Sequence, residues 1–304
     1  MRQGVYGAPP AALAPEVASA PQFSPLHPGA QALEALEALE AESLEAFTVL
    51  APPGAAERRY VLAQALRALK AGAPLLALAP KAKGGARLRA ELESFGCDVE
   101  EWSKAHHRLC RVSRPERLAG LEDALAQGGP QFCEETGFFT QPGVFSWNRI
   151  DPGSRLLAGA LPQLSGRGAD LGCGYGFLAR EILRSETVRS LALIDVDRRA
   201  IEAARRNVED ARASFFQADA TRDDCGLSGL DFVVTNPPFH DAGTEDRALG
   251  ARVVEAAARL LRKGGTLRLV ANRHLPYEAT LKAQFRGVEQ AAEGEGYKIF
   301  EAVK

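Results

Sequence analysis

The sequence predicts an α/β protein with two units, a smaller N-terminal one of residues 1–130 and a larger C-terminal one of residues 131–304. The length of 304 residues suits two domains of ordinary size, and a hydrophobic content of 46% can fill two cores. Apolar segments of strand length also alternate with helix-forming segments twice, between residues 47 and 113 and again from about residue 167. Such alternation is typical of sheets covered by helices.

The N-terminal unit begins with a segment that we expect to be extended or irregular, because residues 1–30 contain six prolines. Residues 31–46, QALEALEALEAESLEA, consist mainly of strong helix formers and therefore predict a helix. The elements that follow are expected to alternate, with strands at residues 47–53, 74–80 and 107–113, a helix at 56–71, and a second helix that begins after Gly84 and Gly85 and ends at Phe95.

The alternation in the C-terminal unit is longer and predicts a mostly parallel sheet, because helices separate the successive strands. Two such halves in tandem raise the hypothesis of an ancient duplication. The strands are expected at residues 168–172, 191–196, 214–218, 231–236, 266–272 and 297–303, and the helices at 176–185, 198–210, 245–262 and 276–285.

Composition disfavours several classes of protein. No run of 18 or more apolar residues is present, and the N-terminus does not resemble a signal peptide, so no membrane partner is expected. Five cysteines, an odd number without a CxxC pair, argue against a disulfide framework and a structural zinc site. We therefore expect a cytoplasmic protein that holds no metal.

Charge is unevenly distributed along the N-terminal unit, although the net charge of the chain is only −2. Residues 31–57 carry six acidic residues and no Lys or Arg, whereas residues 58–117 carry 13 Lys or Arg against six Asp or Glu. This basic block can attract nucleic-acid phosphates, but a solvated surface explains it as well. The candidates for phosphate contacts are Arg87, Arg89, Arg108, Arg111 and Arg114.

The first chemical motif is ADLGCGYG at residues 169–176, where an apolar strand runs into Gly172, Gly174 and Gly176 before a helix. Glycines at such a turn let the backbone bend sharply and approach a ligand closely. An ordinary strand–helix turn or a dinucleotide site would also fit. The GxGxG spacing after Asp170, however, resembles motif I of class I methyltransferases.

Two further acids lie near the ends of predicted strands, Asp195 still on its strand and Asp219 just after the next one. Asp195 lies 19 residues after Gly176, where a carboxylate can accept hydrogen bonds from both ribose hydroxyls of a nucleoside. Its neighbour Asp197 is the competitor for that role but fits a helix N-cap better. Asp219 could accept a hydrogen bond from an adenine amine, and it fits a turn residue equally well.

The most specific motif is DFVVTNPPFH at residues 231–240, an apolar strand that ends in Asn-Pro-Pro-Phe. The prolines fix the direction of the chain, so the amide oxygen of Asn236 and the carbonyl of Pro237 can both accept hydrogen bonds from a planar exocyclic amine. Phe239 offers a flat face on which a flipped base can stack. A strand-ending turn and core packing are the alternatives, which the preceding glycine motif disfavours.

Five segments together resemble the bacterial 16S ribosomal RNA guanine-N2 methyltransferases over about residues 137–303. NPPF alone is shared with adenine-N6 and glutamine-N5 methyltransferases, so the specificity comes from the combination. The segments are PGVFSWNRIDPGSRLLAGALP (142–162), DLGCGYG (170–176), IDVDRRAIEAARRN (194–207), TNPPFHDA (235–242) and VANRHLPY (270–277).

The resemblance implies a Rossmann-like class I methyltransferase domain with a seven-stranded, mostly parallel sheet, preceded by a degenerate methyltransferase-like domain that recognises RNA. It also implies S-adenosylmethionine as cofactor, ribosomal RNA or the 30S subunit as partner, and a monomer. The cofactor would be bound by Phe145 and Ser146 at its methionine end, by Asp170, Gly172, Cys173, Gly174 and Gly176 along the glycine turn, by Asp195 and Val196 at its ribose, by Asp219 and Ala220 at its adenine, and by Asn236.

The same resemblance assigns the target base to Asn236, Pro237, Pro238 and Phe239. His240 and Asp241 extend this loop, and we expect His240 to position or pack rather than to act as a general base.

Three other functions remain open at this point. The same loop could methylate an adenine amine or a protein glutamine amide, and the chain could be a non-catalytic RNA-binding protein with a methyltransferase fold. The intact glycine motif and NPPF disfavour the latter. A nicotinamide dehydrogenase is disfavoured because NPPF has no place in its site.

Overall fold

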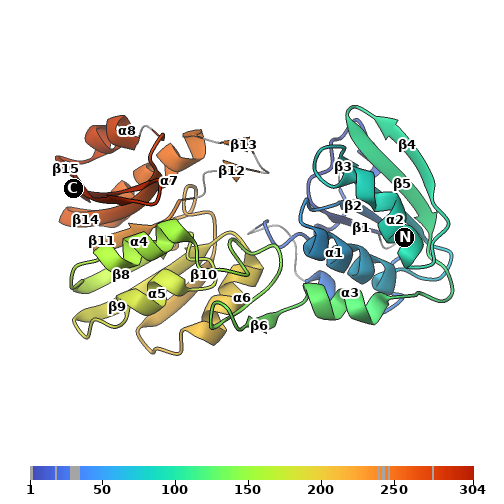
Figure 1. Ribbon diagram of the computed structural model, residues 1–304, viewed down its shortest axis with the longest axis horizontal. Coiled ribbons are helices and arrows are strands. Elements are labelled where there is room, and N and C mark those ends of the chain that lie inside the picture. Colours follow the sequence, from blue (N-terminus) through green and yellow to red (C-terminus); the bar gives the residue numbers. More distant parts are fainter. Residues whose placement is uncertain are drawn as a thin grey trace. The chain divides into compact units, whose positions relative to one another are not determined.

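The computed structural model describes residues 3–17, 19–27, 35–237, 240–241, 244–245, 247–275 and 277–304. It divides the chain into two compact units, Met1–Pro130 with Gln141–Gly143 and Gln131–Thr140 with Val144–Lys304. The two units are coloured from blue to green and from green to red in Figure 1.

The N-terminal unit contains a five-stranded sheet in the order β1-β2-β3-β5-β4. β1, β2 and β3 are parallel, whereas β5 runs antiparallel to both of its neighbours. The strands are β1 (Gln3–Tyr6), β2 (Ala46–Leu50), β3 (Pro74–Pro80), β4 (Glu100–Lys104) and β5 (His107–Ser113), and the helices are α1 (Ala55–Ala68), α2 (Leu88–Ser94) and α3 (Leu121–Gly128), with 3-10 turns at Pro15–Val17, Leu36–Ala38 and Gly85–Arg87.

Successive side chains of β3 point to opposite faces of the sheet, and each face has its own hydrophobic core. Leu75 and Ala77 join a core that also contains side chains of α1 and α2. Leu76 and Leu78 join a second core, which includes Val17 from the proline-rich first segment. That segment therefore covers one face of the sheet without forming a long helix.

The helix predicted over residues 31–46 is wrong in the part that the structure describes. Residues 35–46 contain only the 3-10 turn Leu36–Ala38 before β2 begins. Leu36, Leu39 and Leu44 are all buried, so an irregular path here places all three leucines in the core. Tertiary burial overrides the strong helix propensity of Ala, Leu and Glu.

The C-terminal unit contains a seven-stranded sheet in the order β10-β9-β8-β11-β14-β16-β15. The first five strands in this order are parallel, and β16 runs antiparallel to β14 and β15. The strands are β8 (Gly166–Leu171), β9 (Val188–Asp195), β10 (Ala213–Gln217), β11 (Leu230–Thr235), β14 (Leu261–Asn272), β15 (Gly287–Gly294) and β16 (Tyr297–Val303).

Helices cover both faces of this sheet, and Figure 1 shows α4 and α5 in front of its strands. Side chains from α4, α5 and α6 pack in one core, and side chains from α7 and α8 pack in the other. The helices are α4 (Pro152–Ala160), α5 (Phe177–Ile182), α6 (Arg198–Asn207), α7 (Arg247–Leu260) and α8 (Tyr277–Gln284), and two short hairpins are formed by β6 (Gln131–Cys133) with β7 (Phe138–Thr140) and by β12 (His240–Asp241) with β13 (Thr244–Glu245).

This architecture places the predicted motifs at one edge of the sheet. β8, β9 and β11 are parallel, so the residues after their carboxyl ends gather together. These residues include Gly172, Val196 and Asn236. In open parallel sheets this edge is where ligands bind. No helix in the described part of the chain is long and apolar enough to span a bilayer.

Candidate active site

The glycine turn connects β8 to α5 through three residues with left-handed backbone. Gly172, Gly174 and Gly176 have φ angles of 72°, 53° and 93°, which favour glycine. A Cβ on Gly176 would lie 2.9 Å from Val208 Cγ2, so glycine there also lets the chain pass close to the end of α6. A Cβ on Gly174 would meet nothing within 4 Å, which leaves open space above the turn.

Asp195 ties this turn to the end of β9. Its Oδ2 accepts a hydrogen bond from Gly174 N at 2.9 Å, and its Oδ1 accepts one from Asp197 N at 2.9 Å. Each carboxylate oxygen can accept more than one hydrogen bond, so Asp195 keeps acceptor capacity for a ligand. Burial raises the pKa of Asp195 to about 6, while the N–H groups of Asp197 and Gly174 oppose that shift.

Asp170 lies beneath the turn and is fully buried. Neither of its carboxylate oxygens has a hydrogen-bond partner of good geometry among the described residues, although the N–H of Ala179 is near enough to oppose the rise in its pKa. Burial, and then the negative charge of Asp195, raise the pKa of Asp170 to about 8. A buried polar group without a partner is costly, and groups of this kind concentrate at functional sites.

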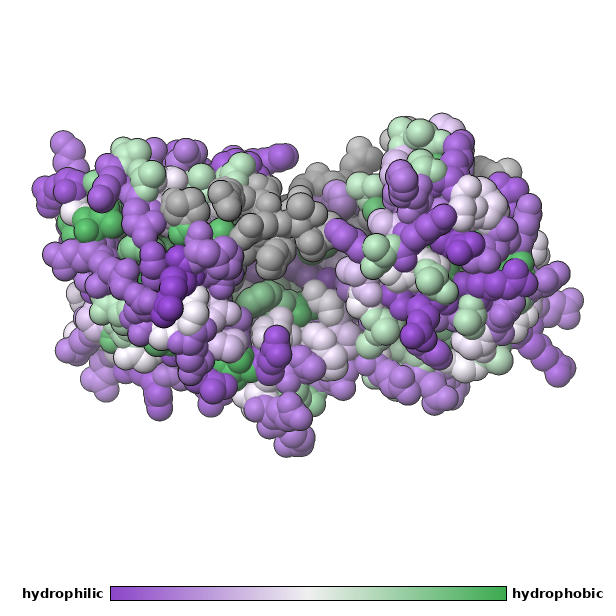
Figure 2. Space-filling model, turned by 45° about the horizontal axis from the view of Figure 1, so that its top comes forward, coloured by the Kyte–Doolittle hydropathy of each residue, from purple (hydrophilic) through white to green (hydrophobic). Residues whose placement is uncertain are grey.

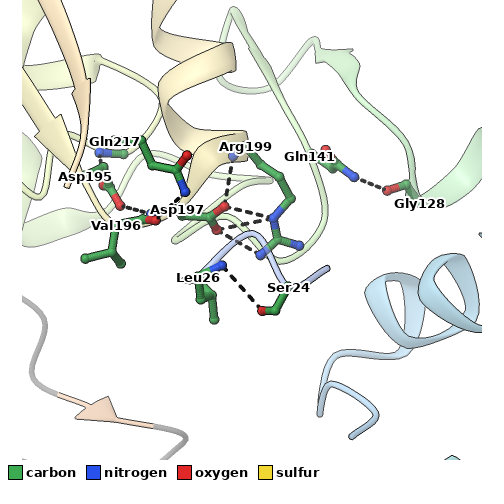
Figure 3. A network of polar contacts seen from close by, with 10 residues as sticks. Ser24, Leu26, Gly128, Gln141, Asp195, Val196, Asp197, Arg199 and Gln217 are labelled. Carbon is green, nitrogen blue, oxygen red and sulfur yellow. Dashed lines mark hydrogen bonds and ion pairs between the residues drawn. The ribbon is translucent and has the colours of Figure 1, made fainter. Parts of the chain in front are cut away.

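Asp197 has the capping role that distinguishes it from Asp195. Its carboxylate caps α6 by accepting from Arg199 N at 2.9 Å, and it forms a buried ion pair with the Arg199 guanidinium at 2.8 Å. The neighbouring Gln217 Nε2 donates to Val196 O at 3.3 Å. Figure 3 shows Asp195, Asp197, Arg199 and Gln217 in one network around Val196.

Asp219 and Ala220 lie after β10, at the far side of β9. The Asp219 Oδ1 accepts from Thr221 N and Oγ1 at 3.0 and 2.6 Å, and Oδ2 pairs with Arg222 at 3.3 Å. Ala220 packs against the core on the side of α7. The carboxylate of Asp219 therefore stabilises the turn that follows β10. Neither Asp219 nor Ala220 lines the pocket beside the glycine turn.

Asn236 follows β11 and is anchored to the start of α4. Its Nδ2 donates to Asp151 Oδ2 at 2.9 Å and to Ser154 Oγ at 2.8 Å. Its Oδ1 is buried and has no partner among the described residues. The preceding residue, Thr235, donates from Oγ1 to Leu171 O at 2.7 Å and so joins the ends of β11 and β8.

One pocket brings six of the predicted residues together: Phe145, Ser146, Gly172, Cys173, Gly174 and Asn236. Sequence analysis missed five other lining residues, which are Asp151, Ser154, Tyr175, Phe177 and Leu178. The segment from Asp151 to Ser154, Asp-Pro-Gly-Ser, does indicate the start of a helix, because Asp before Pro is typical of a helix N-cap. Tyr175 and Phe177 are braced by Phe138, whose ring centroid lies 5.3 and 6.1 Å from theirs.

Phe145 and Val196 are among the few large hydrophobic side chains that the described part of the chain exposes. The visible surface of both units is otherwise mostly hydrophilic, as Figure 2 shows. Phe145 is 62% exposed, and Ser146 beside it has a left-handed φ of 52° while its Oγ donates to Arg149 O at 2.9 Å. An exposed aromatic ring beside a pocket suits contact with a ligand.

Some predicted residues lie beyond the described part of the chain. Pro238 and Phe239 fall outside the described residues, and of His240 and Asp241 only the backbone is described. Pro237 is buried at the end of β11. Burial raises the pKa of the Cys173 thiol well above its usual range, so this thiol stays neutral and is no nucleophile.

The basic side chains of the N-terminal unit differ in their availability. Arg89 pairs with Glu93 at 2.8 Å, Arg108 pairs with Glu101 at 3.3 Å, and Arg114 is buried beside Glu42 at 3.1 Å. Arg87 and Arg111 are exposed, and the guanidinium of Arg111 lies 5.4 Å from the Trp102 ring centroid. These two are therefore the strongest of the five candidates for phosphate contacts.

Within the described ranges, no three His, Cys, Asp or Glu side chains are grouped as a metal site would need. The five cysteines are all free thiols.

Comparison with known proteins identifies the family. The methyltransferase small domain family matches residues 135–301. The ribosomal RNA small subunit methyltransferase C of Shewanella pealeana is 30% identical over 278 residues, which cover 86% of this chain and 78% of that protein. The protein of the same name from Shewanella sediminis is 36% identical over 162 residues, 52% of this chain and 46% of that protein.

A solved structure has the same fold. The T. thermophilus 16S rRNA N2 G1207 methyltransferase, in complex with AdoMet and guanosine, superposes with a TM-score of 0.81 over 100% of this chain and 88% of its own, at 22% identity. The predicted fold class is thereby confirmed. With the family match over the C-terminal unit and relatives aligned along most of the chain, this protein belongs to the ribosomal RNA small subunit methyltransferase C family, within the methyltransferase small domain family.

Proposed function

We propose that this protein transfers a methyl group from S-adenosylmethionine to the exocyclic N2 amine of a guanine in 16S ribosomal RNA of the small subunit. The observation that carries the proposal is the buried, unpartnered Oδ1 of Asn236 beside the glycine turn. An acceptor without a partner at a pocket wall suits a ligand that brings a donor. The relatives are named for ribosomal RNA of the small subunit, and the T. thermophilus enzyme is named for the N2 of a guanine, an amine that carries two hydrogens.

The residues of the pocket fit the proposed cofactor. The open space above Gly174 admits a ligand close to the backbone, and Asp195 keeps acceptor capacity for ribose hydroxyls. The raised pKa values of Asp170 and Asp195 also mean that a positive charge bound beside them would favour their ionised forms, and S-adenosylmethionine carries a positive sulfonium. Phe145 and Ser146 would face its methionine end. When bound, the cofactor supplies an electrophilic methyl group.

The amine of guanine is a weak nucleophile because its lone pair is delocalised into the ring. Two acceptors on its hydrogens, Asn236 Oδ1 and the carbonyl of Pro237, would favour a more pyramidal nitrogen and direct its lone pair. The contribution of the protein is then placement of the reacting groups in line, with fixed dipoles instead of a strong base. Phe239 would stack on the flipped base.

We also propose that the N-terminal unit binds RNA and performs no chemistry. It lacks a glycine motif of the DxGxGxG type, and its exposed Arg87 and Arg111 suit phosphate contacts. Its remaining candidate arginines are engaged by acidic side chains, so they contribute to the fold instead.

The test is methylation of small subunits purified from a strain that lacks the endogenous enzyme. Radiolabelled S-adenosylmethionine and full-length protein are incubated with these subunits, and the nucleosides of the digested RNA are identified by mass spectrometry. We expect N2-methylguanosine at one position, and the guanine equivalent to that of the T. thermophilus enzyme is the first candidate.

Other products would contradict the proposal. N6-methyladenosine would identify an adenine amine as the acceptor, and label in a protein fraction would identify a glutamine amide. Cofactor binding by calorimetry, without transfer to any fraction, would indicate an RNA-binding protein that has lost its activity.

A further inference from the structure

The side chain of Asn236 has no free donor. Its Nδ2 carries two hydrogens, and these are directed to Asp151 Oδ2 at 2.9 Å and Ser154 Oγ at 2.8 Å. Oδ1 is buried without a partner among the described residues. The only hydrogen-bonding group that Asn236 still offers is therefore an acceptor.

The orientation of this amide follows from the chemistry of Asp151. An ionised carboxylate can only accept hydrogen bonds, so the atom of Asn236 that faces Asp151 must be the nitrogen. Asp151 is itself fixed, because Oδ2 also accepts from Ser154 N at 2.8 Å as the N-cap of α4. If the amide were turned over, its oxygen would face the carboxylate, and two acceptors would repel each other.

We propose that Asp151 and Ser154 are positioning residues that set the polarity of the Asn236 amide, so that the pocket presents an acceptor and selects a substrate with an exocyclic amine. This inference rests on the proposed function and explains how the chain enforces it. The negative charge of Asp151 on the amide N–H also polarises the amide and strengthens Oδ1 as an acceptor. The first turn of α4 is thus coupled to the chemistry through Asn236.

The rival explanation is that Asp151 only caps α4. Replacing Asp151 by Asn separates the two roles, because Asn is as good an N-cap as Asp. An Asn side chain lacks the charge and can also place its amide nitrogen where Oδ2 lies. In that rotamer the nitrogen donates to a turned-over Asn236 amide, which presents its NH2 group to the pocket, and the bond from Ser154 N is given up. Capping alone therefore predicts no effect of Asp151→Asn, whereas the positioning role predicts a large one.

The first measurement is single-turnover methylation of small subunits by full-length Asp151→Asn. We expect the maximal rate to fall on the order of 10- to 100-fold, because the acceptor that aligns the amine is replaced by a donor in part of the population. The KM for subunits, the affinity for S-adenosylmethionine and the melting temperature should stay close to wild type. Ser154→Ala removes one of two anchors and should lose less.

The matched control is Asp223→Asn, which removes the same charge from an exposed turn where Asp223 accepts from Cys225 N at 2.8 Å. This variant should keep the wild-type rate. Its role is to show that loss of one negative charge on the C-terminal unit does not by itself slow transfer.

The second measurement does not depend on transfer. Calorimetry in the presence of S-adenosylhomocysteine compares the binding of guanosine with that of inosine, which lacks the exocyclic amine. Wild-type protein should prefer guanosine, and Asp151→Asn should lose that preference. Wild-type rate and wild-type preference in Asp151→Asn would overturn the inference.

Failure of the proposed function would look different. If wild-type protein methylates another amine, the guanine assignment fails, and the rate of Asp151→Asn on that acceptor still decides whether Asp151 sets the polarity of the amide.

Discussion

At the scale of single residues, the active site depends on which hydrogen-bonding groups are already used. Asn236 uses its donors on α4, Asp195 accepts from backbone N–H groups at each oxygen, and Asp170 has no hydrogen-bond partner of good geometry. The unused acceptors all lie near the glycine turn at the ends of β8, β9 and β11. A site with several unused hydrogen-bond acceptors suits a ligand that carries hydrogen-bond donors and a positive charge.

The first prediction concerns Asn236→Ala. Methyl transfer should fall by about 100-fold or more, because losing one dipole aimed at the reacting group typically costs that much. The affinity for S-adenosylmethionine, measured by calorimetry, should change much less, since Asn236 is assigned to the base. A variant that retains more than about a tenth of the wild-type rate would refute the role.

The second prediction concerns Asp195→Ala. The Kd for S-adenosylmethionine should rise by about one or two orders of magnitude, because charged hydrogen bonds contribute about 1.5–3 kcal/mol each. Part of the loss comes from the glycine turn, which loses its bond from Gly174 N. An unchanged Kd would mean that another acid, with Asp197 the first to test, holds the ribose.

The third prediction concerns the pH dependence of stability without cofactor. The pKa of Asp170 rises on folding from 3.8 to about 8, so the folded state binds this proton more tightly than the unfolded state. The resulting stabilisation is complete below the unfolded pKa and is lost as pH rises through the folded pKa. Asp195, with a pKa of about 6, and the buried thiols, whose pKa values are raised from 9.0, titrate mainly outside the window between about pH 6.5 and pH 8, so the slope in this window comes chiefly from Asp170.

Denaturant unfolding across that window tests the point. Wild-type protein should lose stability as the pH rises, and Asp170→Asn should show a flatter profile whatever its absolute stability. Parallel profiles for the two proteins would show that Asp170 does not titrate there.

At the scale of elements, the β6–β7 hairpin supports the pocket through Asn207 at the end of α6. Asn207 Oδ1 accepts from Phe139 N, and its Nδ2 donates to Phe139 O and Tyr175 O, each at 2.8 Å. The same hairpin carries Phe138 against the rings of Tyr175 and Phe177. A single side chain thus joins a helix, a hairpin and the glycine turn.

The fourth prediction is that Asn207→Ala lowers the free energy of unfolding by about 2–3 kcal/mol, since three hydrogen bonds contribute about 1 kcal/mol each. Denaturant unfolding measures this. Asn207→Asp is the comparison, because it keeps the acceptor for Phe139 N and loses both donors. A loss below about 0.5 kcal/mol in Asn207→Ala would mean that packing of Phe138 alone holds the hairpin.

Elements with strong local patterns could be predicted from the sequence, and others could not. Pro74–Pro80, His107–Ser113 and Tyr297–Val303 were predicted with their exact bounds, because each is a compact run rich in apolar residues. The polar edge strands Glu100–Lys104 and Gly287–Gly294 were missed, since an edge strand needs no apolar alternation.

The same division applies to the site. The glycine turn and the Asn-Pro-Pro segment have sequence patterns of their own, and the structure brings Gly172, Gly174 and Asn236 to one pocket. The anchors of Asn236 lie 85 and 82 residues away, and no local pattern specifies such contacts. Asp219 has a local pattern that does not decide its role. The same residue after a strand can stabilise a turn, as it does here, or contact an adenine.

At the scale of the whole molecule, the sheet of the N-terminal unit repeats part of the C-terminal one. The order β1-β2-β3-β5-β4 has the same strand directions as β8-β11-β14-β16-β15. α1 connects β2 to β3 as α7 connects β11 to β14, and α2 precedes β4 as α8 precedes β15. This agreement supports the hypothesis of a duplication. Among the residues that the structure describes, the N-terminal sheet has no counterpart of β9, the strand that carries Asp195.

The segment that follows β2 also corresponds to the segment that follows β11. Ala51 and Pro52 follow β2 as Asn236 and Pro237 follow β11. Alanine offers no amide, and the carbonyls of Pro52 and Pro53 accept hydrogen bonds from Arg58 Nη1 at 3.2 and 2.7 Å. Arg58 is itself buried and paired with Glu91 at 2.7 Å. The guanidinium of Arg58 thus occupies the backbone carbonyls after β2, whereas the corresponding carbonyl after β11 is expected to accept from the target amine.

The last prediction concerns the N-terminal unit, for which we propose RNA binding without chemistry. Arg87→Gln with Arg111→Gln should weaken binding of 16S ribosomal RNA by about 10-fold and flatten its salt dependence, because the slope falls by about one for every phosphate that the protein no longer neutralises. Cofactor affinity should not change. The matched control is Arg184→Gln with Arg189→Gln, two exposed arginines near the amino end of β9, at the edge opposite the pocket. Fluorescence anisotropy at several salt concentrations measures both pairs. Equal slopes for the two double variants would show that Arg87 and Arg111 do not bind phosphates, and the N-terminal unit would then serve the enzyme only as structural support.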